Sequence, residues 1–289
     1  MKTHSSSIRE LRRHYTDMLS EIYDPNESNT IVMMLIEHYF GFNKISLALN
    51  PDLCLNEDEF MKLDQAVSEL MTNRPIQYVI GETEFCGMLF EVNENVLIPR
   101  PETEELVCMI SSTVNGQRPT DSFNILDIGT GSGCIAISLA KLLKNSEVTA
   151  IDISAKALEV ARRNTVSNDV SVNFICADIL SNPHLTKKFD IIVSNPPYVR
   201  KSEKKTMRAN VLGFEPSGAL FVDDDDPLIF YRHIMHFAGN NLNPNGVVWF
   251  EINESLGEET AELCRSVGFG NSTVIKDSSG KDRFVKATR

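Results

Sequence analysis

The sequence predicts an α/β protein in which helices cover both faces of a mostly parallel sheet, with a small helical bundle in front of it. Two observations lead to this prediction. From Ser122 onward, short apolar runs alternate with segments of helical period, which is typical of a parallel sheet with crossover helices. Before residue 83, apolar residues recur mainly at helical spacing. With 289 residues, the chain is long enough for one large or two modest domains.

Residues 1–83 are expected to form the bundle. The first expected helix carries its apolar residues on one face: Ile8, Leu11, Tyr15, Met18 and Ile22. A second helix is expected near residues 30–40, ending at Gly41. Asn56 and Glu59 have the spacing of a capping box, which predicts the start of a third helix. Its stripe is Phe60, Leu63, Val67, Leu70 and Met71.

Residues 84–98 are expected to link the bundle to a second domain, residues 99–289. The composition from Thr83 to Val92 favours strands, a turn is expected at residues 93–95, and residues 96–98 are expected to be extended. We therefore expect a β-hairpin in this linker. Pro101 suits the first turn of a following helix, and capping is the plain explanation of Glu102 and Glu104.

The second domain is expected to alternate strands and helices. The expected strands are residues 123–128, 147–152, 172–176, 189–194, 246–252 and 284–287. The expected helices after the one at Pro101 are residues 134–143, 155–164, 227–237 and 257–267.

Composition narrows the function classes. The formal net charge of −12 argues against a large phosphate-binding surface, so no stable nucleic-acid binding is expected. No apolar run reaches membrane-spanning length and no signal peptide is expected, so we expect a cytoplasmic protein without membrane contact. The six cysteines are expected to be reduced core residues. His233 and His236 form the only paired-histidine spacing, and without a third ligand no metal is expected.

A glycine-rich loop follows the first strand of the second domain: Gly129, Thr130, Gly131, Ser132 and Gly133. Glycines let a ligand approach the backbone, and the next helix offers free N–H groups there. Asp152 ends the following strand, where its carboxylate can accept ribose hydroxyls. Counted from Gly131, the loop also satisfies the looser dinucleotide fingerprint, so a nicotinamide site stays open at this point.

The sequence Asn195-Pro196-Pro197-Tyr198 ends an apolar strand. Proline fixes φ and has no N–H, so an amide side chain, a rigid carbonyl and an aromatic ring are placed at the carboxyl end of a strand. Ligands bind at that end in open α/β sheets. Two acceptors and a ring suit a planar –NH2 group, and we interpret the motif as a clamp for an amide or exocyclic amine.

A methyl donor that contains adenosine, ribose and a sulfonium fits between the glycine-rich loop and this clamp. Asp178 ends the third strand, where it can read the adenine amine, and Ile179 can pack on the adenine face. Ordinary loop packing explains these two residues equally well.

With these motifs assembled, the chain resembles the PrmC/HemK family of protein-(glutamine-N5) methyltransferases over nearly its whole length. The matching motifs are Arg74-Pro75-Ile76-Gln77-Tyr78, Pro99-Arg100-Pro101-Glu102-Thr103-Glu104, the glycine-rich loop, the Asn195 motif, Glu215-Pro216-Ser217-Gly218, and Asp277 with Gly280 and Arg283. The chain departs from the family pattern at Asp223-Asp224-Asp225-Asp226, where glycines are expected, and at Ile179, where some relatives carry an aromatic residue.

The resemblance implies a Rossmann-like, S-adenosyl-L-methionine-dependent methyltransferase domain. It also implies that the protein substrates are peptide chain release factors of translation termination, methylated on the glutamine of a Gly-Gly-Gln motif. In that reaction Asn195 and the Pro196 carbonyl would accept the two amide N–H groups, and Tyr198 would pack on the amide.

Three alternatives stay open. The clamp also suits an adenine-N6 methyltransferase acting on a flipped base of RNA or DNA. A nicotinamide-dependent oxidoreductase and a non-catalytic adaptor are the other two.

Overall fold

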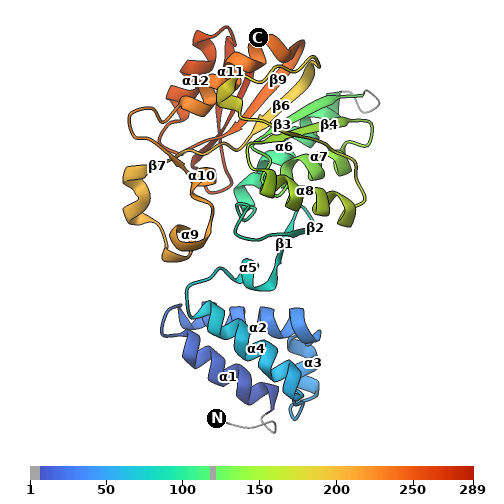
Figure 1. Ribbon diagram of the computed structural model, residues 1–289, viewed down its shortest axis with the longest axis vertical. Coiled ribbons are helices and arrows are strands. Elements are labelled where there is room, and N and C mark those ends of the chain that lie inside the picture. Colours follow the sequence, from blue (N-terminus) through green and yellow to red (C-terminus); the bar gives the residue numbers. More distant parts are fainter. Residues whose placement is uncertain (1–6, 118–121) are drawn as a thin grey trace. The chain divides into compact units, whose positions relative to one another are not determined.

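The structure is a computed structural model that describes residues 7–117 and 122–289 (Figure 1). It divides into two compact units. Unit 1 comprises Met1–Gly81 and Arg208–Phe214, and unit 2 comprises Glu82–Met207 and Glu215–Arg289. A segment from the second half of the sequence thus belongs to the N-terminal unit.

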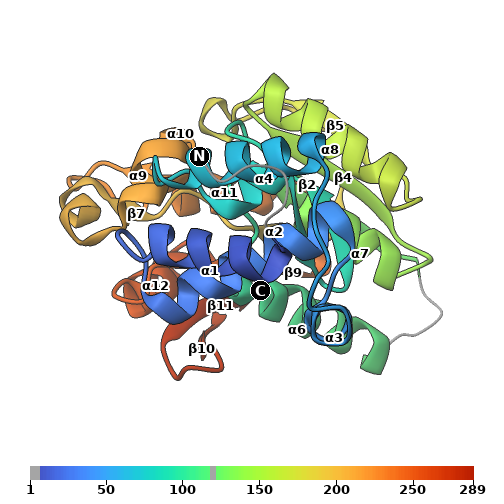
Figure 2. The ribbon, with the colours of Figure 1, turned by 90° about the horizontal axis from the view of Figure 1, so that it is seen from below.

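Unit 1 is helical. Its elements are α1 (Ile8–Leu19), α2 (Pro25–Phe40), α3 (Lys44–Leu49), α4 (Glu57–Leu70), α5 (Ile76–Ile80) and α9 (Ala209–Phe214). Helices α1, α2 and α4 pack side by side around one apolar core, and Figure 2 shows them from a second direction. The predicted capping box of Asn56 and Glu59 is confirmed. Ile22 was placed wrongly in the first helix, because α1 ends at Leu19 and leaves Ile22 exposed.

Unit 2 contains a seven-stranded sheet in the order β10-β11-β9-β6-β3-β4-β5. Its strands are β3 (Asn124–Ile128), β4 (Glu147–Asp152), β5 (Asn173–Cys176), β6 (Phe189–Ser194), β9 (Leu242–Glu251), β10 (Asn271–Lys276) and β11 (Asp282–Thr288). The neighbouring strands from β9 to β5 pair in parallel. Strand β11 is antiparallel to both of its neighbours, β9 and β10. The predicted mostly parallel sheet is confirmed, although β10 was not predicted.

Helices cover both faces of this sheet. They are α6 (Pro101–Gln117), α7 (Cys134–Leu142), α8 (Ala155–Ser167), α11 (Ile229–Asn241) and α12 (Gly257–Ser266). Unit 2 also contains the short elements η1 (Ile179–Ser181), β7 (Val199–Arg200), η2 (Lys201–Thr206), α10 (Ser217–Leu220) and β8 (Phe221–Val222). Successive strand residues enter opposite cores, since Leu126 packs with α11 and α12 whereas Ile125 packs with α6 and α7.

A hairpin of β1 (Glu82–Phe85) and β2 (Met88–Glu91) opens unit 2. The expected position of its turn was wrong. Cys86 and Gly87 form the two-residue loop, both with positive φ as such tight hairpin turns require. Residues 93–95 make a later turn, and residues 96–98 are not a strand. Phe85 and Phe90 fix the hairpin in the core beside α6 and α7.

The cysteines correct another expectation. None of the six forms a disulfide, but Cys54, Cys108 and Cys176 are exposed and Cys86 is half-buried. Only Cys134 and Cys264 lie in the core. Apolar neighbours in sequence do not decide which side of an element faces the core. In the part of the chain that the structure describes, no helix combines the length and apolarity needed to cross a bilayer.

Asn164 of α8 ties the hairpin to the sheet and generates the first prediction. Its fully buried amide accepts from the Glu91 N–H at 2.7 Å and donates to the carbonyls of Glu91 at 3.0 Å and Ser132 at 2.9 Å. Asn164→Ala should lower the free energy of unfolding by about 2 kcal/mol, because one buried and two partly buried backbone groups lose their partner. Urea denaturation measures the change.

The neighbouring residue provides a matched control. Arg163 pairs with the Glu91 side chain in an exposed ion pair, so Arg163→Ala should cost only about 0–1 kcal/mol. Equal losses in the two variants would contradict the account of Asn164.

Candidate active site

Strand β6 lies between β3 and β9, and its register builds the site. Ser194 is opposite Ile128 of β3 and Phe250 of β9, in parallel pairing on both sides. The Ser194 hydroxyl also donates to the Ile128 carbonyl at 2.7 Å. The residues that follow these three positions, Gly129, Asn195 and Glu251, therefore come out together at the carboxyl edge. The strand order changes direction here, which is where open α/β sheets bind ligands.

The glycine-rich loop is open toward Asn195. Gly129, Gly131 and Gly133 have φ of +77°, +55° and +83°, a region that disfavours side chains. A Cβ at Gly131 would meet no atom within 4 Å, and one at Gly129 would meet only the Asn195 carbonyl oxygen at 4.0 Å. At Gly133 a Cβ would lie 2.9 Å from Ile137 Cδ1, so this third glycine serves close helix packing. The first two leave room for a ligand.

Asp127 lies buried at the end of β3, just before this loop. Its Oδ2 accepts a hydrogen bond from the Thr130 hydroxyl at 2.6 Å, whereas Oδ1 is buried without a hydrogen-bond partner among the described residues. Burial raises the pKa of Asp127 to about 7, the Thr130 hydrogen bond and the nearby Ala136 backbone N–H oppose this shift, and the charge of Asp152 adds to it. A buried carboxylate oxygen without a partner fits a ligand that carries an amino group. The residues present therefore suit a donor of the S-adenosylmethionine type.

Asp152 ends β4 beside the loop. Its Oδ2 accepts from the Gly131 N–H and its Oδ1 from the Ser154 N–H, both at 2.8 Å. Burial raises the pKa of Asp152, and these backbone donors oppose the shift. Each carboxylate oxygen has a further lone pair, so the expected role in accepting ribose hydroxyls stays a prediction.

Asp178 and Ile179 have local explanations. Asp178 caps η1, accepting from the Leu180 N–H at 2.8 Å and the Ser181 hydroxyl at 3.2 Å. Ile179 is buried in the core that contains α11. Their expected contacts with adenine stay predictions.

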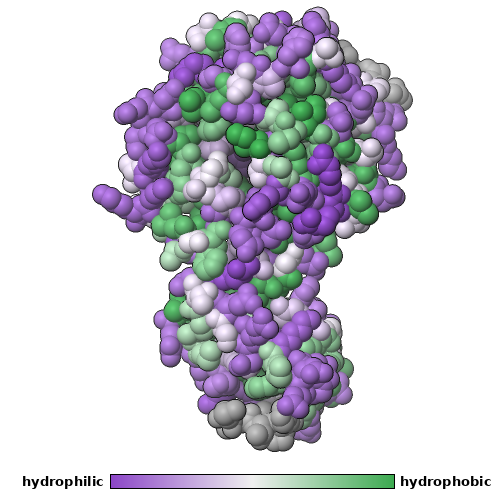
Figure 3. All heavy atoms as spheres, viewed as in Figure 1, coloured by the Kyte–Doolittle hydropathy of each residue, from purple (hydrophilic) through white to green (hydrophobic). Residues whose placement is uncertain are grey.

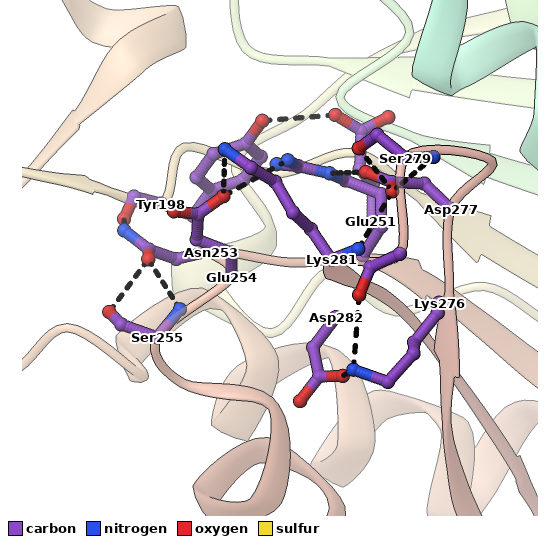
Figure 4. A network of polar contacts seen from close by, with 12 residues as sticks. Tyr198, Glu251, Asn253, Glu254, Ser255, Lys276, Asp277, Ser279, Lys281 and Asp282 are labelled. Carbon is purple, nitrogen blue, oxygen red and sulfur yellow. Dashed lines mark hydrogen bonds and ion pairs between the residues drawn. The ribbon is translucent and has the colours of Figure 1, made fainter.

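The Asn195 side chain is half-buried and held on one side. Its Nδ2 donates to Thr103 Oγ1 at 3.2 Å, and the Thr103 hydroxyl donates to Glu251 Oε2 at 2.7 Å. The Tyr198 hydroxyl donates to the other oxygen, Oε1, at 3.0 Å. Figure 4 shows Tyr198 and Glu251 within one network of polar contacts. Pro196 is buried, and Pro197 is half-buried.

Burial dominates the electrostatics of this network. It raises the pKa of Glu251, although the hydrogen bonds from Thr103 and Tyr198 and the charge of Arg283 oppose it. Burial also raises the pKa of Tyr198 far above its ordinary value, with the Glu251 charge adding to the shift. Tyr198 therefore keeps its proton at neutral pH and acts as a donor. On the side of unit 2 seen in Figure 1, Figure 3 shows hydrophobic residues gathered in the middle, with hydrophilic residues around them.

Sequence reasoning missed Thr103 and Glu251 as site residues. Thr103 stands in a helix start that was explained by capping, and Glu251 continues an apolar strand. A carboxylate at the end of an otherwise apolar strand was the available signal. The capping account is also incomplete for Glu104, because its Oε1 accepts from the Cys86 N–H and holds the hairpin turn. Arg100 pairs with the buried Glu215.

The aspartate run that departs from the family pattern lies at the surface. Asp223 pairs with Lys201, Asp224 accepts from the Ser202 backbone and hydroxyl, and Asp226 pairs with Arg232. No group of three metal-ligating side chains occurs within residues 7–117 and 122–289.

Comparison with known proteins agrees with this geometry. Residues 10–81 match the family model of the PrmC N-terminal domain, and residues 110–214 match that of the methyltransferase small domain. The release factor glutamine methyltransferase of Flavobacterium psychrophilum is 47% identical over 279 residues, covering 96% of this chain and 98% of the relative. That of Bacteroides thetaiotaomicron is 43% identical, covering 94% and 96%. That of Leptospira interrogans is 35% identical, covering 99% of each chain.

Solved structures show the same fold at low identity. A T. thermophilus 16S rRNA N2 G1207 methyltransferase, solved with AdoMet and guanosine, superposes with a TM-score of 0.53 at 17% identity, covering 72% of this chain and 49% of that one. A methyltransferase from Pyrococcus furiosus gives 0.50 at 20%, covering 78% and 98%.

The sheet order, the open glycine-rich loop and these matches define an S-adenosylmethionine-dependent methyltransferase. The chain belongs to the release factor glutamine methyltransferase family, which confirms the resemblance seen in the sequence.

Asp127 generates a prediction about pH. Its folded pKa of about 7 lies above its ordinary value of 3.8, so the folded state binds the proton more tightly. The resulting stabilisation is complete below the ordinary pKa and is lost as pH rises through the folded pKa. Asp127→Asn does not titrate there. The free energy of unfolding of wild type minus that of the variant should fall by up to about 1.4 kcal/mol per pH unit between about pH 5 and pH 7.

Urea denaturation across that range measures this difference. A difference that stays constant, or that rises with pH, would contradict the raised pKa.

Proposed function

We propose that this protein transfers a methyl group from S-adenosyl-L-methionine to the side-chain N5 of the glutamine in the Gly-Gly-Gln motif of peptide chain release factors. The observation that carries the proposal is the Asn195 amide, held by Thr103 next to an open glycine-rich loop. Membership of a family whose curated relatives are named for release factor glutamine methylation supports the choice of substrate. The reaction is proposed to take place in the cytoplasm, where translation termination occurs.

An amide nitrogen is a weak nucleophile because its lone pair is delocalised into the carbonyl group. The Asn195 side-chain oxygen and the Pro196 carbonyl would accept its two N–H groups, which holds the nitrogen and raises its electron density. Tyr198 would pack on the flat amide. S-adenosyl-L-methionine, when bound, supplies a methyl carbon activated by its positive sulfur. The contribution of the protein is therefore placement and hydrogen bonding, and it needs no nucleophilic side chain.

The donor site is proposed to lie at the carboxyl edge of β3, β4 and β5. The glycine-rich loop, residues 129–133, would line the donor, Asp152 would accept the ribose hydroxyls, and Asp178 and Ile179 would contact the adenine. Asn195 would border donor and substrate. The buried Asp127 Oδ1 without a partner is the second observation that supports a donor at this loop.

A second candidate is an adenine-N6 methyltransferase, because the Asn195 motif also suits a flipped adenine. Net charge of −12 disfavours it. Supplying labelled donor with a purified release factor or with RNA and DNA separates the two functions. Label on nucleic acid but not on the release factor would overturn the proposal. The family match disfavours the nicotinamide alternative, and turnover would exclude a non-catalytic adaptor.

Asn195→Ala tests the clamp. Turnover should fall about 10²-fold or more, as for a lost hydrogen bond in the transition state. Donor affinity measured by calorimetry should stay nearly unchanged, because the glycine-rich loop and Asp152 remain. A variant that turns over within a few-fold of wild type would show that the clamp assignment is wrong.

The helical region, residues 1–83, is proposed to dock the release factor, since one glutamine offers few contacts. A chain that begins at Thr83 should bind the donor normally yet methylate the intact factor poorly. A short glutamine peptide should be an equally weak substrate for the shortened and the full-length chain. Methylation of the intact factor at the full-length rate would remove the docking role. Failure of the short chain to fold would support a stabilising role instead.

A further inference from the structure

The Glu251 carboxylate connects two parts of the proposed clamp. It is 1% exposed at the end of β9, and Thr103, on α6, is 2% exposed. Thr103 donates to Oε2 and Tyr198 donates to Oε1. Both carboxylate oxygens thus accept a hydroxyl hydrogen. One comes from Thr103, which touches Asn195. The other comes from Tyr198, which Figure 4 shows beside Glu251.

The direction of these hydrogen bonds determines how the Asn195 amide is oriented. A threonine hydroxyl has one proton. Because Thr103 gives that proton to a carboxylate, its oxygen can only accept from its other neighbour. The group of Asn195 that faces Thr103 must then be the –NH2, which agrees with the 3.2 Å contact between Asn195 Nδ2 and Thr103 Oγ1. The side-chain oxygen is left as an acceptor for another group.

We propose that Glu251 is a positioning residue that fixes the Asn195 amide through the Thr103 hydroxyl, so that the Asn195 oxygen faces the substrate amide. The inference rests on the proposed function. It states that two residues outside the Asn-Pro-Pro-Tyr motif, Thr103 and Glu251, determine the orientation of the Asn195 amide. A reversed Asn195 amide would present its –NH2 to the substrate –NH2, and one of the two substrate N–H groups would lose its acceptor.

The role requires an ionised carboxylate. Two hydroxyl donors need two acceptors, and only a carboxylate offers an acceptor at both oxygens. A glutamine at this position would present an –NH2 to one of them. Arg283 supplies the compensating positive charge, and it is itself held by Asp277 at 3.1 Å and by Glu254 at 3.5 Å. Glu102 is a further charged group near Glu251, and its negative charge raises the pKa of that carboxyl.

The same carboxylate also holds Tyr198. Its hydroxyl is anchored on Glu251, and its backbone carbonyl accepts from Asn253 Nδ2 at 3.2 Å. Tyr198 is therefore held at its hydroxyl and at its backbone carbonyl, while its ring packs against the core. One buried charge thus positions both the acceptor and the ring of the clamp.

Kinetics of isosteric variants test the proposal. Glu251→Gln and Thr103→Val should each lower kcat for release factor methylation by about 10- to 100-fold, with the donor Kd unchanged. Thr103→Ser keeps the hydroxyl and should stay within about threefold of wild type. Thr113→Val on the same helix is the matched control. Its hydroxyl donates to the Met109 carbonyl of its own helix, away from the clamp residues, so kcat should not change.

The double variant Thr103→Val with Glu251→Gln should lose no more than about threefold beyond the worse single variant, because both break one chain of hydrogen bonds. A loss of kcat in the double variant equal to the product of the two single losses would overturn the proposal. A kcat of Thr103→Val within threefold of wild type would also overturn it. If Glu251→Gln does not fold, the proposal is tested by comparing kcat of Thr103→Val with kcat of Thr103→Ser.

A measurement without substrate separates this inference from the proposed function. The side-chain –NH2 signals of Asn195 can be assigned in ¹⁵N-labelled protein by their loss in Asn195→Asp. They should shift and exchange faster with solvent in Thr103→Val than in wild type, even if no release factor is methylated. Unchanged Asn195 signals in that variant would overturn the positioning role, whereas absent methylation with shifted signals would overturn only the proposed function.

Discussion

The parallel pairing of β6 with β3 and β9 is the constraint on which the site depends. Ile128, Ser194 and Phe250 lie opposite one another, so the next residue of each strand emerges at one edge. A one-residue slip of β6 would turn its apolar side chains to the wrong core and also move Asn195 away from the open glycines. Fold stability and site assembly therefore depend on the same register, and the Ser194 hydrogen bond to Ile128 supports it.

The site also contains carboxylates whose burial is unfavourable for the free energy of folding. Asp127 and Glu251 are fully buried carboxylates near the carboxyl ends of β3 and β9, the two strands that flank β6, and burial raises the pKa of both. Buried charges of this kind seldom stabilise a fold. Their value lies in directed hydrogen bonds. Asp127 keeps an unpartnered oxygen beside the glycine-rich loop, and Glu251 orders two hydroxyl donors.

Much of this arrangement could be predicted from the sequence, because period and turn chemistry are local signals. The strand-helix alternation, the glycine-rich loop and the Asn195 motif located the sheet and its edge. The β10 strand and the hairpin turn at Cys86 were missed, because an edge strand of mixed polarity and a positive-φ cysteine have weak local signatures. Thr103 and Glu251 could not be paired from sequence, because 148 positions separate them and only tertiary packing joins them. The same limit applied to the exposed cysteines, whose burial depends on the packing of whole elements.

Mass spectrometry of a purified release factor, incubated with this protein and S-adenosyl-L-methionine, tests the central claim most directly. The account predicts one added methyl group, located by fragmentation on the side-chain nitrogen of the glutamine in the Gly-Gly-Gln peptide, formed about 10²-fold or more slowly with Asn195→Ala. A methyl group on another residue, or an unmodified factor alongside methylated adenine in added RNA or DNA, would contradict it.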